Sequence, residues 1–101
     1  MDLNGYDIDG VLSRGYEPVA PYVVISGRTW GEVTHLTLDP PPLAIAPRGV
    51  GVVGDRKDAA LWKIKMITQW GVTTFYDDDP FQVALIKDAC GSVCRVVLVT
   101  I

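Results

Sequence analysis

Short apolar runs alternate with amphipathic stretches along this chain of 101 residues. The run Tyr22–Ile25 is apolar throughout, which is typical of a strand buried on both faces of a parallel sheet. Runs of similar length recur along the chain, bounded by glycine, proline or aspartate. We therefore predict strands over five segments: Leu3–Ile8, Ala20–Ile25, Leu43–Ala46, Val72–Tyr76 and Val93–Ile101.

The segments between these runs carry helical patterns. From Asp55 to Trp70, apolar residues recur at steps of three and four, and Gly71 supplies a stop signal. A second amphipathic helix is predicted over Phe81–Ala89, ended by Gly91, and a weaker pattern predicts a short helix over 28–36. Such alternation predicts an α/β fold, a three-layer Rossmann-like parallel sheet of about five strands with right-handed crossovers.

Composition narrows the class of protein. A chain of this length, 49% hydrophobic, can form one compact domain, which we assign to residues 1–101. Its formal charge of −3 argues against holding long nucleic acid by bulk electrostatics, because such binding shows a basic footprint.

The N-terminal sequence, the length of the apolar runs and the cysteines bear on where the protein is found in the cell. We find no signal peptide pattern at the N-terminus, and the longest strongly apolar run, 96–101, is too short to span a bilayer. We therefore expect a soluble, cytoplasmic protein. Cys90 and Cys94 are interpreted as buried thiols, although the sequence also permits a disulfide between them.

The most informative chemistry is a pair of aspartates, Asp7 and Asp9, where the first strand runs into Gly10. On an extended strand these two side chains would point to opposite faces, so they can meet one ligand only if the chain turns, as Gly10 permits. Such a pair can hold Mg²⁺ and leave a carboxylate oxygen free to attack phosphorus. The alternative is a turn in which the aspartates cap backbone groups.

Other polar residues follow other predicted strands. Ser26 follows the second strand, and Asp77, Asp78 and Asp79 follow the fourth. In parallel α/β sheets, ligands bind beyond the carboxyl ends of the strands, where these residues would meet. Lys57 lies at the start of the long predicted helix, where its ammonium and the helix N-terminus would both favour an anion.

These segments resemble the four motifs of the haloacid dehalogenase superfamily, in the family's order and over nearly the whole chain. The matching segments are Asp7-Ile-Asp-Gly-Val-Leu, Val24-Ile-Ser-Gly-Arg, Lys57 and Phe75-Tyr-Asp-Asp-Asp. The resemblance implies a minimal HAD-like core and a Mg²⁺-dependent phosphatase that works through an aspartyl-phosphate.

The resemblance also implies roles for individual residues. Asp7 would be the nucleophile and Asp9 the general acid and base. Ser26, Gly27, Arg28 and Lys57 would bind the phosphoryl group, with Ser26 and Lys57 also counted as catalytic. The expected Mg²⁺ ligands form one set: Asp7, the backbone carbonyl of Asp9, Asp77 and Asp78.

Some assignments have competitors. Lys63 and Lys65 are alternatives to Lys57, but they lie inside the predicted helix, where a lysine is more often solvated, so we favour Lys57. Asp79 is also interpretable as a helix cap before Pro80. Arg28 completes a Ser-Gly-Arg sequence similar to that of the polynucleotide 3′-phosphatase branch, and its alternative is a surface cation.

The chain has no room for the cap domain that many relatives insert, because about a dozen residues separate Asp9 from the second strand. Capless members of the superfamily tend to act on large substrates, such as phosphorylated nucleic-acid ends or proteins, or to use a neighbouring subunit of a homo-oligomer as a lid. The Ser-Gly-Arg and Asp-Asp motifs favour nucleic-acid ends, so the expected substrate is a nucleotide or a polynucleotide end. Two other functions remain open. They are a receiver-like phosphoacceptor domain, whose lysine would follow the last strand, and a non-catalytic binding or structural member of the superfamily.

Overall fold

The structure, a computed structural model, describes residues 2–27, 37–48 and 56–100. Its elements are β1 (Asn4–Tyr6), the 3-10 helix η1 (Leu12–Arg14), β2 (Tyr22–Ser26), β3 (Ile45–Pro47), α2 (Arg56–Trp70), β4 (Thr74–Asp77), α3 (Pro80–Cys90) and β5 (Arg95–Leu98). The five strands form one parallel sheet in the order β3-β2-β1-β4-β5. The predicted α/β class with a five-stranded parallel sheet is therefore confirmed.

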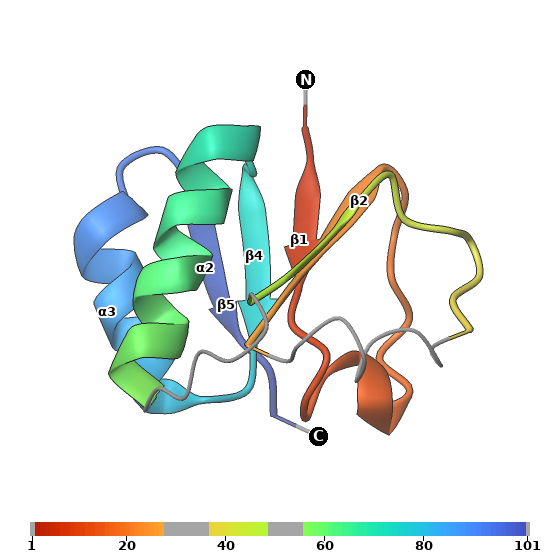
Figure 1. The fold of residues 1–101 in the computed structure, drawn as a ribbon, viewed down its shortest axis with the longest axis horizontal. Helices are drawn as coiled ribbons and strands as arrows, with labels where there is room; N and C mark the ends of the chain where they lie inside the picture. Colours follow the sequence, from red (N-terminus) through yellow and green to blue (C-terminus); the bar gives the residue numbers. More distant parts are fainter. Residues whose placement is uncertain (1, 28–36, 49–55, 101) are drawn as a thin grey trace.

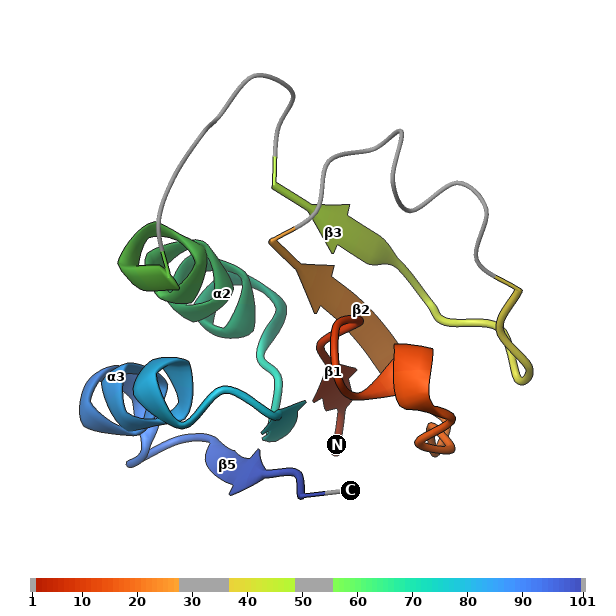
Figure 2. The same ribbon diagram turned by 90° about the horizontal axis from the view of Figure 1, so that it is seen from below.

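The strand order gives the sheet a switch point between β1 and β4. From β1 the chain adds β2 and β3 on one side and then returns to add β4 and β5 on the other. Figure 2 looks onto the carboxyl edge and shows this arrangement. The order matches the first five strands of the Rossmann fold, in which ligands bind outside the carboxyl ends of the strands at such a point.

All five strands lie where the sequence predicts them, with shifted boundaries. The second and fourth strands each run one residue further than predicted, so Ser26 and Asp77 are the last residues of β2 and β4. The third strand is displaced toward Pro47. Both long helices agree with their predicted spans to within one residue at each described end. The helix predicted over 28–36 lies outside the described residues.

Helices α2 and α3 cover the same face of the sheet (Figures 1 and 2). A buried cluster joins that face to the two helices, and it includes Val23, Ile25, Met66, Phe75 and Ile86. On the opposite face, the segment that contains η1 packs over a second cluster around Tyr6, Tyr22 and Val24. Both α-helices of the described ranges lie on one face, so the three-layer arrangement stays a prediction.

Helix α3 begins as its sequence predicts. The Asp79 carboxylate accepts hydrogen bonds from the backbone N–H groups of Phe81 and Gln82, and Pro80 occupies the first turn. Proline suits this position because its missing N–H would have no partner within the helix. The interpretation of Asp79 as a helix cap is confirmed.

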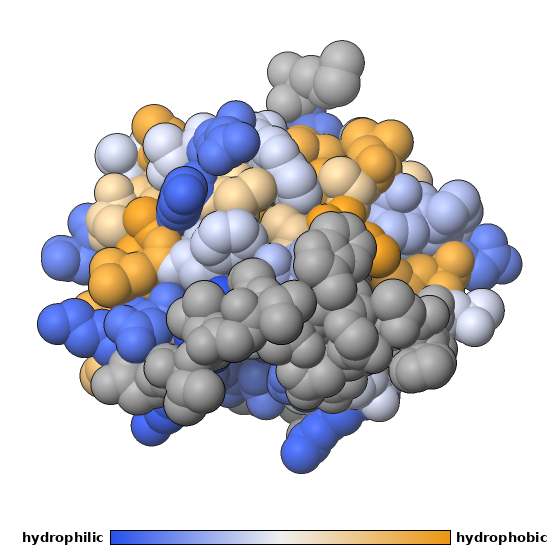
Figure 3. All heavy atoms as spheres, in the orientation of Figure 1, coloured by the Kyte–Doolittle hydropathy of each residue, from blue (hydrophilic) through white to orange (hydrophobic). Residues whose placement is uncertain are grey.

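The surface over the two helices mixes residue types. In Figure 3, hydrophilic and hydrophobic residues are interspersed over the face that carries α2 and α3. Leu61 and Phe81 are among the exposed apolar side chains. None of the helices in the described ranges has the length and apolar character needed to cross a bilayer.

The close approach of β4 to β1 gives a prediction about the core. Gly5 is paired with Phe75, and a Cβ on Gly5 would lie 2.8 Å from Phe75 Cδ1 and 3.0 Å from a Val72 methyl. Phe75 is fully buried, so its ring has little room to move. Gly5→Ala should therefore destabilise the protein by about 1–3 kcal/mol, measured by urea unfolding.

The matched background for this variant is Phe75→Leu, which removes the ring that the new methyl group would meet. The loss caused by Gly5→Ala should be clearly smaller in that background, because the two positions are in contact. Equal losses of stability in both backgrounds would show that the Phe75 ring does not limit the size of the side chain at position 5.

Candidate active site at the carboxyl edge of the sheet

Strand alternation brings Asp7 and Asp77 together. Phe75 faces the helices, so Asp77, two residues later on β4, lies on the same face at the end of the strand. The N–H of Asp7 donates to the carbonyl of Tyr76 over 3.0 Å, which carries the pairing of β1 with β4 past Tyr6. Both aspartates are buried, with exposures of 4% and 0%. Two carboxylates therefore lie at the carboxyl ends of neighbouring strands, at the switch point.

Lys63 of α2 is buried between these carboxylates. Its Nζ lies 2.7 Å from Asp77 Oδ2 and 3.4 Å from Asp7 Oδ1. It also donates to Gln82 Oε1 of α3 over 2.6 Å. The residue is only 2% exposed, and a buried ammonium is tolerated only when it is paired and hydrogen-bonded. Lys63 thus supplies positive charge directly at the nucleophile position that the sequence predicts.

Asp78 completes a group of three carboxylates. One oxygen from each of Asp7, Asp77 and Asp78 lies within 4.8 Å of the other two, a separation that would let them share one cation. Gly10 makes room for Asp78, because a Cβ on Gly10 would lie 1.8 Å from Asp78 Oδ2. Gly10 also has a positive φ of 74°, which favours glycine. Glycine at position 10 therefore suits both the backbone of this turn and the place that the Asp78 carboxylate occupies.

Burial and like charge raise the pKa values of two of these aspartates. Removal from water is the main cause for Asp7 and raises its pKa to about 8, with Lys63 opposing and Asp77 adding to the shift. Burial, followed by the charge of Asp77, also raises the pKa of Asp78. A divalent cation would reverse both effects, because it favours the ionised form of every carboxylate around it. Oxygen ligands of this kind suit Mg²⁺, so the residues fit the ion that the sequence predicts.

Asp79 has a different environment from its two neighbours. Its carboxylate pairs with the Arg56 guanidinium through two contacts, one of them Nε to Oδ2 at 2.8 Å. Hydrogen bonding to Arg56 lowers the pKa of Asp79 to about 2. Because Asp79 also caps α3, its oxygens are already engaged. Asp77 and Asp78 are therefore the members of the aspartate run that face Asp7.

Three other predicted site residues lie at or just after the carboxyl ends of β1 and β2. Ser26 is buried at the end of β2, next to β1, and its carbonyl accepts the N–H of Arg48 over 3.1 Å. Gly27 lies beside the first turn of α2, with Ala59 Cβ 3.4 Å from where its own Cβ would be. Asp9 is exposed, and its charge contributes to the raised pKa of Asp7. Its side chain is not part of the three-carboxylate group, and Arg28 lies outside the described residues.

The structure places Lys63, not Lys57, at the carboxylates. Lys57 is exposed in the first turn of α2, and no ion pair joins it to Asp7 or Asp77. The sequence contains a signal for Lys63. It lies three residues after Ala60 and four before Ile67, both buried, so it falls on the core-facing side of the helix. A lysine at such a position requires a buried partner of opposite charge.

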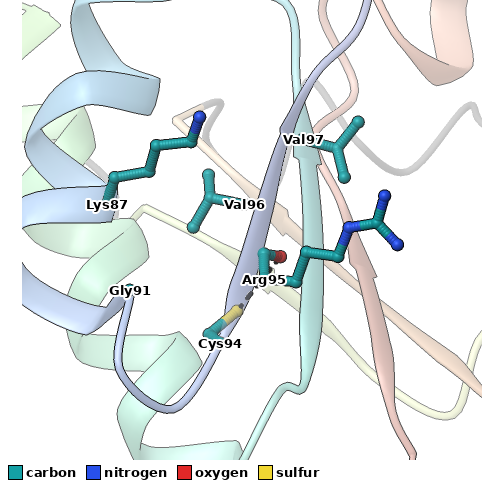
Figure 4. A pocket seen from close by; sticks show the side chains of 6 residues that line it. All are labelled: Lys87, Gly91, Cys94, Arg95, Val96 and Val97. Carbon is teal, nitrogen blue, oxygen red and sulfur yellow. Dashed lines mark hydrogen bonds between the residues drawn. The ribbon is translucent and has the colours of Figure 1, made fainter.

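A separate hollow lies along β5, away from these carboxylates. Its lining residues are Lys87, Gly91, Cys94, Arg95, Val96 and Val97. Figure 4 shows Lys87 reaching from α3 toward Val96, while Arg95 and Val97 project from the other face of the strand. Both Cys90 and Cys94 are buried free thiols, as predicted, and burial raises their pKa values.

Comparison with known proteins finds no matching family model and no curated protein or solved structure with significant similarity to this chain.

The raised pKa of Asp7 predicts how stability depends on pH in the absence of a divalent cation. Between about pH 4 and pH 8 the folded protein keeps a proton on Asp7 that the unfolded chain has lost, so stability should fall as the pH rises. Asp7→Asn removes this penalty. We expect the variant to exceed the wild type in stability by an amount that grows across this window, reaching on the order of a few kcal/mol.

The measurement is urea unfolding in chelator from pH 4.5 to 8, with Asp88→Asn on the exposed face of α3 as the control. The control should run parallel to the wild type. With Mg²⁺ the order should reverse, because the wild type gains a ligand that the variant binds poorly. An Asp7→Asn variant less stable than the wild type at every pH in chelator would contradict the assigned electrostatics.

Proposed function

We propose that this protein is a Mg²⁺-dependent phosphohydrolase of the haloacid dehalogenase type, which cleaves phosphomonoesters through an aspartyl-phosphate. One observation carries the proposal: the Lys63 ammonium is buried against Asp7 and Asp77, beside Asp78, at the switch point of the sheet. A buried group of mixed charges at this place in an α/β sheet is typical of a functional site. The four sequence motifs, in the order typical of the haloacid dehalogenase superfamily, support hydrolysis through an aspartyl-phosphate.

In the proposed reaction, Asp7 Oδ attacks phosphorus and the bond from phosphorus to the leaving oxygen breaks. Asp9 donates a proton to that oxygen as it departs, then takes a proton from the water that hydrolyses the acyl phosphate, which restores free Asp7. The exposed position of Asp9, on the turn after β1, suits a group that exchanges protons with a departing alcohol and with water.

Lys63 takes the role that the sequence assigned to Lys57. Its ammonium balances the charge of Asp7 before the reaction and the charge on the phosphoryl oxygens during it. Ser26, at the end of the neighbouring strand, would hydrogen-bond a phosphoryl oxygen. Asp7, Asp77, Asp78 and the carbonyl of Asp9 would hold Mg²⁺, which would neutralise charge on the phosphoryl group and the carboxylates.

For the substrate we propose a nucleotide or a polynucleotide end. Cationic residues other than Lys63 also occur at the carboxyl edge: Arg14 in η1, Arg48 after β3, and Arg56 and Lys57 in the first turn of α2. Side chains of this type bind additional phosphates. Arg56 already pairs with Asp79, and Arg14 is exposed, so Arg14 is the better candidate.

The strand order weighs against the receiver-like alternative. Receivers use the order 2-1-3-4-5, whereas this sheet has the order 3-2-1-4-5. A receiver-type lysine would follow the last strand, and Val93–Ile101 contains none. The remaining alternative is a non-catalytic member of the superfamily, which an activity assay excludes or supports directly.

The first test of the proposed function is hydrolysis of a generic aryl phosphate with Mg²⁺ and with excess chelator. Chelator should abolish turnover. Lys63→Met should lower kcat by at least about 100-fold, as loss of one preorganised donor to a transition-state charge does. Lys57→Met is the matched control on the same helix and should stay within about twofold of the wild type.

All variants should be assayed with Mg²⁺ well below their melting temperatures, because Lys63→Met also leaves two buried carboxylates without their ammonium. If Lys57→Met were the inactive variant, Lys63 would be a structural residue, and Lys57 would be the phosphoryl-binding lysine that the sequence predicts. An inactive wild type, with Mg²⁺ bound, would favour the non-catalytic alternative.

The second test concerns the substrate class. An oligonucleotide 3′-phosphate should be hydrolysed with a higher kcat/KM than the corresponding nucleoside monophosphate, because only the longer substrate offers neighbouring phosphates to exposed cations such as Arg14. The advantage should shrink as salt rises, since it rests on exposed charges. Equal values at low and high salt would point instead to a small phosphomonoester, with any lid supplied by a second copy.

A further inference from the structure

We propose that Gln82 of α3 is a positioning residue that fixes the Lys63 ammonium beside Asp7. The inference rests on the proposed function for its catalytic meaning and on the geometry around Lys63 for its physical content. Gln82 is 8% exposed, and its Oε1 accepts a hydrogen bond from Lys63 Nζ over 2.6 Å. The sequence motifs do not include it.

The ammonium of Lys63 has three hydrogens to donate. Asp77 Oδ2 accepts one at 2.7 Å and Gln82 Oε1 accepts a second at 2.6 Å. Asp7 Oδ1 lies further away, at 3.4 Å. Two short hydrogen bonds from different elements, β4 and α3, therefore hold Nζ in place. The third hydrogen remains for Asp7 or for a phosphoryl group attached to it.

The neutral charge of Gln82 matters as much as its position. A third carboxylate in its place would offset more of the positive charge on Lys63, which is wanted for the phosphoryl oxygens. An amide oxygen accepts the hydrogen bond without adding negative charge. Gln82 can therefore fix the ammonium while leaving its field directed at Asp7.

The amide of Gln82 is itself held in one orientation. Its Nε2 donates to Asp79 Oδ2 over 3.1 Å, and the Arg56 guanidinium binds the same carboxylate. A flipped amide would place its NH₂ group against the ammonium and its oxygen against a carboxylate, both unfavourable. The helix cap of α3 thus orients the side chain that positions Lys63.

The experiment compares Gln82→Met with Gln69→Met, a control for the same substitution at an exposed glutamine of α2. With Mg²⁺ and an aryl phosphate, Gln82→Met should lower kcat/KM by about 10-fold or more, as expected when a hydrogen bond to a charged group is lost. The control should remain within about twofold. Gln82→Asn provides a second variant, which keeps the amide but is too short to reach both Lys63 and Asp79, and it should show a similar loss.

A kinetic cycle with Lys63→Met separates positioning from a general structural role. If Gln82 acts through Lys63, Gln82→Met should change kcat by less than about twofold in the Lys63→Met background. Losses that multiply in the double variant would overturn the proposal, and so would a Gln82→Met enzyme with wild-type kinetics.

A parallel cycle by urea unfolding in Mg²⁺ uses the same four proteins and does not depend on activity. The effects of the two substitutions on the unfolding constant should be non-additive by about fivefold or more, because the side chains are in direct contact. Additive effects would overturn the positioning contact itself. An inactive wild type with a coupled cycle would refute the proposed phosphatase activity while leaving the Gln82–Lys63 contact supported.

Discussion

Burying a lysine ammonium is the constraint on which the site depends. An isolated buried charge is strongly unfavourable, so Lys63 requires carboxylates and acceptors to reach it from the surrounding elements. Asp7 directly follows β1, Asp77 is the last residue of β4, and Gln82 lies in α3. The charge therefore ties four elements of the fold to one point. Loss of the ammonium itself would leave the carboxylates of Asp7 and Asp77 buried without their cation.

The strand order decides where that point lies. Because β1 and β4 are neighbours, the ends of the first and fourth strands share one edge, although about 70 residues separate Asp7 from Asp77. Helices α2 and α3 both begin at this edge and both cover the same face (Figure 1). Their first turns are linked through Arg56 and Asp79. One sheet and the two helices that cover it thus form a buried charge network.

The same network reduces stability in the absence of a cation. Three acidic side chains lie with one oxygen each within 4.8 Å of the others. Burial raises the pKa values of Asp7 and Asp78, and the Lys63 ammonium opposes this shift only in part. Natural proteins tolerate buried groups of like charge mainly at functional sites, where catalytic acids, bases and nucleophiles need shifted pKa values. The apolar cluster beneath α2 and α3 supplies the opposing stabilisation, with Phe75 and Ile86 fully buried.

Hydrophobic patterning by itself determined the five strands and two long helices, because their periodicities of burial are local properties of the chain. It also placed Asp7, Asp77 and Asp78 at strand ends. It placed Lys63 on the core-facing side of the long helix, but it could not show which lysine meets the carboxylates, because Lys57 at the helix start is also compatible with binding an anion. Only the tertiary structure, by packing α2 beside α3 on one face of the sheet, decided that Lys63 meets the carboxylates and that Gln82 holds it there.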